Sequence, residues 1–90
     1  MLELYLKIFG DVIGVNFRYY AKLKADDLGI TGWVKNLSDG SVQIVAQGEK
    51  TNLEKFLKWA RQGPNAARVD KVEIGWAKSE KKFAEFEIRY

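Results

Sequence analysis

The chain has 90 residues, of which 47% are hydrophobic, so we expect residues 1–90 to form a single domain with its own core. It contains no cysteine and no histidine, which excludes disulfides, thiolate metal sites, a cysteine nucleophile and the commonest general base. With 15 Lys and Arg against 12 Asp and Glu, the net charge is +3 and there is no basic tail. No apolar run approaches the ~20 residues of a membrane span, and no signal-peptide pattern is present. We therefore expect a cytoplasmic protein without a membrane partner.

The N-terminal part of the chain passes from a strand pattern to a helix pattern. Residues 2–9 alternate with a period of two, which predicts a strand with one buried face. A loop of residues 10–16 follows, with glycine at positions 10 and 14. From residue 17 the apolar period becomes helical, and Gly29 occupies the position of a C-terminal capping glycine. The apolar stripe of this helix comprises Phe17, Tyr20, Ala21, Ala25 and Leu28.

The middle of the chain predicts a β-hairpin. A short strand covers residues 32–37, Ser38-Asp39-Gly40 supplies the turn, and residues 42–46 alternate as the second strand. Gly40 can adopt a positive φ without steric cost, which suits a tight turn.

A second helix and two further strands complete the pattern. Thr51-Asn52-Leu53-Glu54 matches a capping box, which predicts the start of a helix there. Leu53, Phe56, Leu57 and Ala60 follow at helical spacing, and Gly63-Pro64 ends the helix. Residues 72–76 and 84–90 each alternate as strands.

The order of these elements predicts the fold. Strand, helix, strand, strand, helix and strand, with a short C-terminal strand, is typical of an α+β ferredoxin-like split βαβ sandwich. We expect one antiparallel sheet with both helices on one face. Proteins of this fold bind RNA, metals or small regulators, and some are enzymes, so the function must be argued from particular residues.

The loop of residues 10–18 is the first candidate site. Consecutive N–H groups in such a loop can form an anion-binding nest, and the start of the following helix adds partial positive charge. Arg18 can then close the site with a bidentate contact to phosphate oxygens. The alternative is an ordinary strand–helix connection with a solvated arginine, and this segment alone does not distinguish the two.

Asn36 is the second candidate. Asparagine is depleted in strands, and here it stands at the end of one. Its side chain either caps the hairpin turn or holds a water molecule in line with a phosphate. Both interpretations fit the residue taken by itself.

Two stretches of the chain resemble a known family. They read Gly10-x-Val12-x-Gly14-Val15-x-Phe17-Arg18 and Gly32-Trp33-Val34-Lys35-Asn36-x-x-Asp39-Gly40-x-Val42. In this order and at this separation they closely resemble the two signatures of the acylphosphatase family. Leu28-Gly29-Ile30 and Gly63-Pro64 are also similar, so the resemblance covers essentially the whole chain.

The resemblance implies a hydrolase without a metal or other cofactor that cleaves the carboxyl–phosphate bond of small acyl phosphates. It implies that Arg18 binds the phosphate and that Asn36 orients the attacking water. The implied phosphate cradle is the backbone of Ile13, Gly14, Val15, Asn16, Phe17 and Arg18. An acyl phosphate has a good leaving group, so positioning and charge stabilisation suffice and neither His nor Cys is required.

The chain departs from the family at two positions of the loop. Ile13 stands where glutamine is usual, and Asn16 stands where a glycine or an aromatic residue is frequent. Asparagine tolerates left-handed backbone better than other side-chain-bearing residues, so we expect Asn16 to preserve the loop conformation. A cradle made of backbone N–H groups does not need the Ile13 side chain, and we expect activity to survive.

Two interpretations compete with catalysis. A non-catalytic module could keep the fold and bind a phosphate or a protein partner, although the presence of both Arg18 and Asn36 favours an enzyme. An RNA-binding domain of this topology would use aromatic residues of the sheet, for which Tyr5, Phe9, Trp33 and Trp76 are candidates. No run matches the RNP1 pattern, so we expect no nucleic-acid partner. Because the sequence starts at Met1, we also expect a complete chain rather than part of a hydrogenase-maturation carbamoyltransferase, and a monomer.

Overall fold

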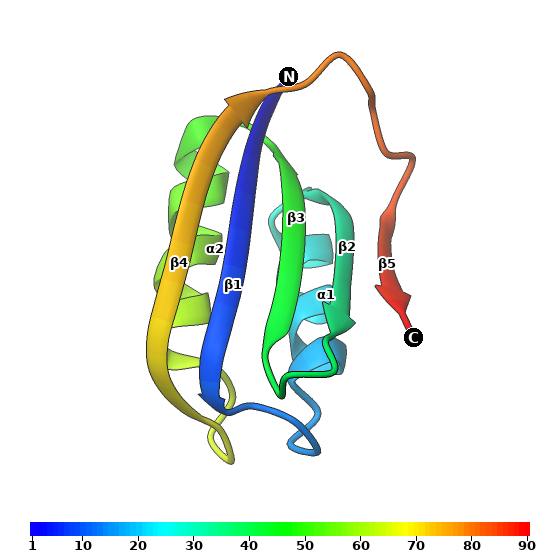
Figure 1. Cartoon of the computed structure of the whole chain (residues 1–90). Coiled ribbons are helices and arrows are strands. Elements are labelled where there is room, and N and C mark those ends of the chain that lie inside the picture. The colour runs from blue at the N-terminus through cyan, green and yellow to red at the C-terminus, as the bar shows by residue number, and fades with distance from the viewer.

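The computed structural model describes residues 1–90. Its elements are β1 (Leu2–Asp11), α1 (Phe17–Asp27), β2 (Thr31–Asn36), β3 (Val42–Gly48), α2 (Lys50–Gln62), β4 (Arg68–Lys78) and β5 (Phe86–Arg89). The strands form one sheet in the order β4-β1-β3-β2-β5, and both helices cover the same face of it (Figure 1). The predicted order of elements and the ferredoxin-like α+β fold are confirmed. Neither helix is long and apolar enough to span a membrane.

The sheet is antiparallel from β4 through β1 and β3 to β2, as predicted. At the outer edge β5 adds a parallel pair, in which Gly32 of β2 pairs with Phe86 and Lys35 pairs with Arg89, so the complete sheet is mixed. Residues 79–85 cross to this edge past the end of the sheet at which β2 begins, and β5 therefore runs in the direction of β2 (Figure 1). Alternation in the sequence predicts this strand but contains no information on its direction.

The core lies between the sheet and the two helices. The alternating residues of β1 and β3 and the apolar stripes of both helices are buried there, and each large aliphatic side chain contributes roughly 1.5–3 kcal/mol by burial. These residues are Leu4, Leu6, Ile8, Val42, Ile44, Ala46, Phe17, Ala21, Ala25, Leu53, Phe56 and Ala60. Tyr20 departs from the predicted stripe and is 43% exposed. The small side chains of Ala21 and Ala25 face the sheet, whereas Tyr20 lines a groove with Trp59 of α2.

The predicted capping box at residues 51–54 is wrong. Helix α2 begins at Lys50 with Glu49 as its N-cap, and no side chain caps its first turn. The Leu53 N–H donates to the Glu49 carbonyl oxygen at 3.0 Å, so the helix starts directly after β3 ends at Gly48. Thr51 is exposed on the first turn, whereas Leu53 is buried in the core.

The glycines predicted at helix and hairpin ends have the expected backbone. Gly29 has a φ of 66° after α1, and the N–H of Ile30 donates to the Ala25 carbonyl oxygen at 2.9 Å, as in a Schellman motif. Gly40 has a φ of 87° in the hairpin turn, and Gly63 has a φ of 69° after α2. The ends of these elements are therefore confirmed.

A β-bulge bends the end of β1 toward the following loop. Phe9 pairs with Lys71 but Gly10 pairs with Val69, so one residue of β4 is left over between the two pairs. The bulge brings Gly10 so close to β4 that a Cβ at this position would lie 2.0 Å from the carbonyl oxygen of Arg68. Gly10 is thus required by the packing of backbone on backbone, and it fixes where the loop of residues 12–16 begins.

The aromatic residues of the sheet are divided between its two faces. Trp76 pairs with Leu4 and therefore shares the face that carries the helices. Tyr5 alternates with Leu4 and lies on the opposite, open face, and its partner Val45 pairs in turn with Trp33. The four candidates named above for stacking on bases thus do not form one continuous aromatic platform.

Candidate active site

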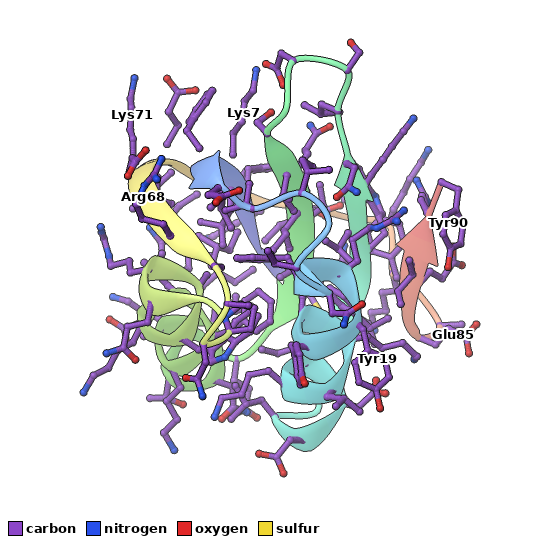
Figure 2. The ribbon with its side chains drawn as sticks, turned by 90° about the horizontal axis from the view of Figure 1, so that it is seen from below. Lys7, Tyr19, Arg68, Lys71, Glu85 and Tyr90 are labelled. Atoms are coloured by element: carbon purple, nitrogen blue, oxygen red, sulfur yellow. The ribbon has the colours of Figure 1, made fainter.

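The site lies at the end of the sheet where β1 and β2 both terminate. Figure 2 views the molecule from this end, with the loop of residues 12–16 crossing from β1 to the start of α1. Tyr90 lies beside β5 on one side of this end, and Arg68 and Lys71 lie on β4 on the other side. The bulge at the end of β1, the start of α1 and the end of β2 therefore meet here.

The loop of residues 12–16 has a backbone that is open to a ligand. Gly14 has a φ of 78° and Asn16 has a φ of 61°, so both adopt left-handed backbone, as expected for Asn16. No N–H group of residues 12–16 donates a hydrogen bond within the protein. Backbone N–H groups are strong hydrogen-bond donors, and consecutive ones in a loop of this kind can form an anion-binding nest.

The start of α1 adds further free N–H groups next to those of the loop. Asn16 is the N-cap, yet its side chain makes no capping hydrogen bond, and the first turn contains no acidic residue. The first helical hydrogen bond runs from the Tyr20 N–H to the Asn16 carbonyl oxygen at 3.1 Å. The N–H groups of Phe17, Arg18 and Tyr19 therefore have no acceptor in the helix, and the helix dipole places partial positive charge at this point.

Phe17 fixes the helix start against the other helix. Its ring is buried, and its centroid lies 5.4 Å from that of Trp59 on α2. A Cβ at Gly63 would lie 2.9 Å from the Phe17 ring, so the glycine at the end of α2 permits this close packing. The loop is thus supported from below by a rigid aromatic contact, while its backbone N–H groups stay free.

Arg18 is half-buried and held by the C-terminal strand. Its Nη1 donates to the carbonyl oxygen of Arg89 at 3.2 Å, and its Cζ lies 4.5 Å from the centroid of the Tyr90 ring. These two contacts use one N–H and one face of the guanidinium. The remaining N–H groups of Arg18 are available to an anion.

Asn36 is the last residue of β2 and carries an unsatisfied acceptor. Its Oδ1 atom is buried and has no hydrogen-bond partner, and no other buried side-chain nitrogen or oxygen in the structure lacks one. A buried polar atom without a partner costs roughly 1–3 kcal/mol, so such a group calls for an explanation. A water molecule or a ligand atom that donates to Oδ1 would satisfy it.

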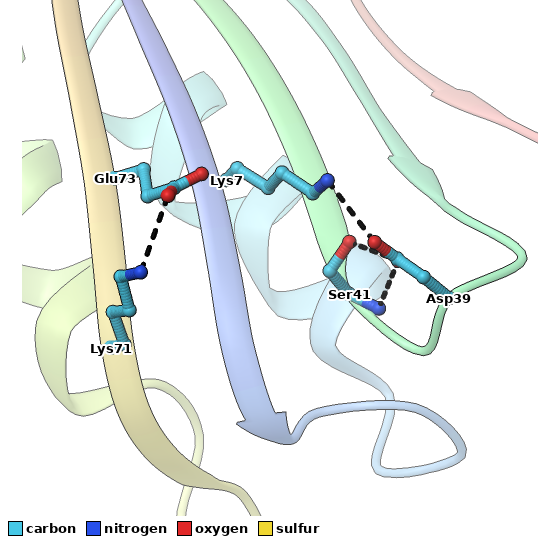
Figure 3. Close-up of polar contacts among 5 residues, drawn as sticks. All are labelled: Lys7, Asp39, Ser41, Lys71 and Glu73. Carbon is cyan, nitrogen blue, oxygen red and sulfur yellow. Dashed lines mark hydrogen bonds and ion pairs between the residues drawn. The ribbon is translucent and has the colours of Figure 1, made fainter.

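In the hairpin turn beside Asn36, by contrast, the Asp39 side chain has hydrogen-bond partners. The Asp39 carboxylate accepts from the Ser41 N–H at 3.0 Å and from the Ser41 hydroxyl at 2.5 Å (Figure 3). Lys7 Nζ lies 3.1 Å from the second carboxylate oxygen, and these contacts hold the pKa of Asp39 down at about 2. Ser38-Asp39-Gly40 is therefore a structural turn, as predicted, and it keeps the end of β2 in place.

A cavity of about 260 Å³ joins these groups. It brings together five of the predicted site residues, namely Gly14, Asn16, Phe17, Arg18 and Asn36. Ile13 and Val15 do not line it: Ile13 is 41% exposed, and Val15 packs against the core and faces a neighbouring hollow. Only the backbone of these two residues can contribute to the predicted cradle.

The C-terminal strand supplies a wall of the cavity that the sequence interpretation did not include. Ile88 and Tyr90 line the cavity, together with Val12 and Tyr19. The strand is held against α1 by a second cation, because Lys22 Nζ donates to the carbonyl oxygen of Phe86 at 2.9 Å. The alternation of Phe86, Ile88 and Tyr90 indicates a strand, but nothing in it shows that this strand lies beside Arg18.

The chemistry available in the cavity follows from its lining. Arg18 is the only charged side chain among the lining residues, so the cavity favours an anion. No group of three or more His, Cys, Asp or Glu side chains that could hold a metal ion occurs in the structure. The cavity offers backbone N–H donors, a guanidinium and an amide, which suits the binding of a tetrahedral oxyanion together with a water molecule.

Comparisons with known proteins identify the family. The sequence profile of the family described as Acylphosphatase matches residues 4–88. An acylphosphatase of Acaryochloris marina is 47% identical over 81 residues, which cover 90% of this chain and 86% of the relative. An acylphosphatase of Archaeoglobus fulgidus is 44% identical over 90 residues, which cover 100% of both chains. This chain belongs to the acylphosphatase family. The crystal structure of acylphosphatase from Bacillus subtilis matches it with a TM-score of 0.97 at 33% identity, over 100% of both chains.

Both acylphosphatase signatures border the cavity. The first, residues 10–18, forms the loop and the start of α1, and the second, residues 32–42, forms β2 and the hairpin turn. Within the acylphosphatase fold these two segments are joined by α1 and lie next to each other because β1 and β2 end on the same side of the sheet (Figure 1). The resemblance found in the sequence is therefore confirmed at the level of the family and of the fold.

Proposed function

We propose that this acylphosphatase hydrolyses the carboxyl–phosphate bond of small acyl phosphates in the cavity beside Arg18. One observation carries the proposal: free backbone N–H groups, the Arg18 guanidinium and the unpartnered Oδ1 of Asn36 border the same cavity. Membership of the family supports the reaction, and the geometry supports the assignment of roles.

The phosphate binds to the loop and to Arg18. The N–H groups of residues 12–16 and of the first turn of α1 donate to the phosphate oxygens, and Arg18 donates its remaining N–H groups. In the transition state the negative charge is spread over the three equatorial oxygens of the phosphoryl group. Donors that are already in place stabilise this charge without reorganisation. The contact of Arg18 with Arg89 keeps the guanidinium at the cavity before substrate arrives.

Asn36 holds the attacking water. Its Oδ1 accepts one hydrogen bond from the water molecule, which leaves an oxygen lone pair free to approach phosphorus in line with the leaving group. The new bond forms between the water oxygen and phosphorus, and the bond from phosphorus to the bridging oxygen breaks with its electron pair remaining on the carboxylate. A proton of the water passes to a phosphate oxygen of the substrate. The absence of histidine and cysteine from the chain is compatible with this route.

The test is phosphate release from acetyl or benzoyl phosphate by the purified protein in the presence of EDTA. We expect kcat/KM to fall by roughly 10³-fold or more for Arg18→Ala, because a phosphate-binding arginine is removed. We expect a fall of about 10²–10³-fold for Asn36→Ala, which removes one positioned group. Arg61→Ala and Asn65→Ala are matched controls, because both residues are exposed and lie outside the cavity, and both should retain wild-type activity.

Three results would contradict the proposal. A folded wild-type protein without hydrolysis would favour the non-catalytic module that binds a phosphate or a protein partner. Loss of activity with EDTA would indicate a metal requirement that the proposed chemistry does not contain. Full activity in Arg18→Ala or Asn36→Ala would remove that residue from the mechanism. We further propose that the enzyme acts as a monomer, which sedimentation at assay concentration would test.

A further inference from the structure

The segment of residues 79–85, here called the crossing segment, connects the two edges of the sheet. It runs from the end of β4 to the start of β5 and has no regular secondary structure (Figure 1). Its first residue is tied to the N-terminus, with Ser79 N–H donating to the Met1 carbonyl oxygen at 2.8 Å. Its last residue is tied to β2, with Gly32 N–H donating to the Glu85 carbonyl oxygen at 3.0 Å.

The middle of the crossing segment is attached through the side chain of Gln47. Gln47 Nε2 donates to the Lys81 carbonyl oxygen at 2.6 Å, and Gln47 Oε1 accepts from the Phe83 N–H at 3.1 Å. The amide thus bonds to the segment as a neighbouring strand would, through one donor and one acceptor. Gln47 is only 1% exposed, so losing these bonds would leave buried polar groups unpaired.

Glu3 fixes which way the amide of Gln47 points. Gln47 Nε2 also donates to Glu3 Oε1 at 2.7 Å, and the Tyr5 hydroxyl donates to Glu3 Oε2. Glu3 is 4% exposed, and its acceptor-only carboxylate would face the Oε1 atom of Gln47 if the amide were rotated by half a turn. The carboxylate therefore selects the one orientation in which Gln47 can bind both Lys81 and Phe83.

The crossing segment determines where β5 begins, and β5 holds Arg18. Phe83 is followed within three residues by Phe86, the first residue of β5. The far end of this four-residue strand provides the Arg89 carbonyl oxygen and the Tyr90 ring that contact Arg18. We infer that Gln47, oriented by Glu3, is a positioning residue for Arg18 that acts through the crossing segment and β5. This inference rests on the function proposed above for Arg18.

Gln47 acts at a distance and does not touch the substrate. It lies near the end of β3 that is remote from the cavity, five positions beyond Val42, which pairs with Asn36. At about 3.3 Å per residue, this separation is roughly 16 Å along the strand. The inference therefore places the effect of Gln47 in the position of β5 and not in a contact with the substrate.

The experiment compares two glutamines of the same strand. Gln47→Met keeps the length and bulk of the side chain but removes its amide, and Gln43→Met makes the same change on the same face, where Gln43 makes no side-chain hydrogen bond. We expect Gln47→Met to lower kcat/KM for acetyl phosphate by about 5- to 30-fold, mostly through KM, since a shift of ~1 Å in a binding group can cost up to about 10²-fold. Inhibition by inorganic phosphate should weaken by a similar factor. Gln43→Met should change neither value by more than about twofold.

A double-mutant cycle with Arg18→Lys separates positioning from general destabilisation. A lysine lacks the planar guanidinium through which Arg18 donates to the Arg89 carbonyl oxygen and stacks on the Tyr90 ring. If Gln47 acts through Arg18, the double variant should be no less active than Arg18→Lys alone. If the folded double variant instead loses kcat/KM by the product of the two single fold-changes, the two residues act independently and the inference is overturned.

Hydrogen exchange decides the question without catalysis. We expect the amides of residues 86–89 to exchange at least tenfold faster in Gln47→Met, while those of β1 and β3 stay protected. Unchanged exchange together with unchanged phosphate binding in the folded variant would overturn the inference even if the enzyme is active. A wild-type protein that does not hydrolyse acetyl phosphate would contradict the proposed function, and exchange and phosphate binding would still test Gln47. Should Gln47→Met fail to fold, Glu3→Gln, which removes the carboxylate that orients the Gln47 amide, should show the same changes at smaller size.

Discussion

Two connections of equal length lie side by side at one end of the sheet and differ in how their backbone is satisfied. The loop of residues 12–16 donates no backbone hydrogen bond within the protein. In the turn of residues 37–41, the N–H groups of Leu37, Gly40 and Ser41 all donate, and Asp39 accepts from two groups and pairs with Lys7. The turn is closed by its own bonds, whereas the loop depends on the packing of Phe17 below it and leaves its donors to a ligand. Unsatisfied backbone, rather than irregular backbone, therefore distinguishes the candidate site from the turn.

The largest contrast is expected between Gly14→Ala and Gly40→Ala. Both glycines have positive φ, 78° and 87°, and a Cβ would meet no atom within 4 Å at either position. The backbone strain should therefore be alike, about 1–2 kcal/mol of stability in each variant by urea unfolding. We expect kcat/KM to fall by roughly tenfold or more for Gly14→Ala, because relaxation of the loop displaces its N–H groups. Gly40→Ala should keep its activity within about twofold.

Two outcomes for these glycine variants would contradict the different roles of the loop and the turn. Equal loss of activity in both variants would mean that the turn contributes to the site as much as the loop does. Full activity in Gly14→Ala would mean that the conformation of the loop is not needed for binding, which would leave Arg18 as the main phosphate ligand.

Inorganic phosphate should stabilise the protein through the same loop. At ten times its Kd, a ligand that binds only the folded state adds about 1.4 kcal/mol, which corresponds to a rise in Tm of roughly 5–10 °C for a chain of this size. Gly40→Ala should show the same rise, and Arg18→Ala should show little of it. Sodium chloride at equal ionic strength is the control. A rise of equal size with chloride would show that charge screening, and not the cradle, is responsible.

The sequence predicts the loop well and its surroundings poorly, for physical reasons. Glycine spacing, the change of period at Phe17 and the strand-terminal Asn36 are local signals, and the structure brings them to one cavity. The contribution of Ile88 and Tyr90 is non-local, because it depends on the path of residues 79–85 across the whole sheet. Local periodicity gives no information about such a path.

Two further differences between sequence and structure concern short motifs: the start of α2 and the side chain of Ile13. The capping-box pattern at Thr51 is present in the sequence, but α2 begins earlier, at Lys50, directly after β3 ends at Gly48. Ile13 lies within the family signature, yet its side chain is exposed and does not line the cavity. A short motif therefore gives the order of the residues here but does not show which side chains line the cavity.

A smaller effect is expected at Asp39, and it depends on pH. The hydrogen bonds from Ser41 and the neighbouring Lys7 lower the pKa of Asp39 to about 2. A lowered pKa in the folded state stabilises the protein above the ordinary pKa of the carboxyl group, 3.8, and this stabilisation is lost as the pH falls through about 2. Asp39→Asn should therefore unfold at lower urea concentration than the wild type at pH 5–7, and the two midpoints should converge near pH 2. Catalytic activity at neutral pH should stay within about twofold, since the turn is not part of the cavity. A difference in midpoint that persists below pH 2 would show that the carboxylate is not its source.

The smallest effect is expected at Ile13, inside the loop itself. Its side chain is 41% exposed and lines no part of the cavity, so Ile13→Gln and Ile13→Ala keep the N–H group and change only groups in solvent. Both variants should remain within about 0.5 kcal/mol of wild-type stability and within about threefold of its kcat/KM. This result, set beside a large effect of Gly14→Ala at the next residue, would assign binding to the backbone of the loop. If Ile13→Gln instead raises kcat/KM tenfold or more while Ile13→Ala does not, a polar side chain at this position reaches the substrate, and the cradle is not made of backbone alone.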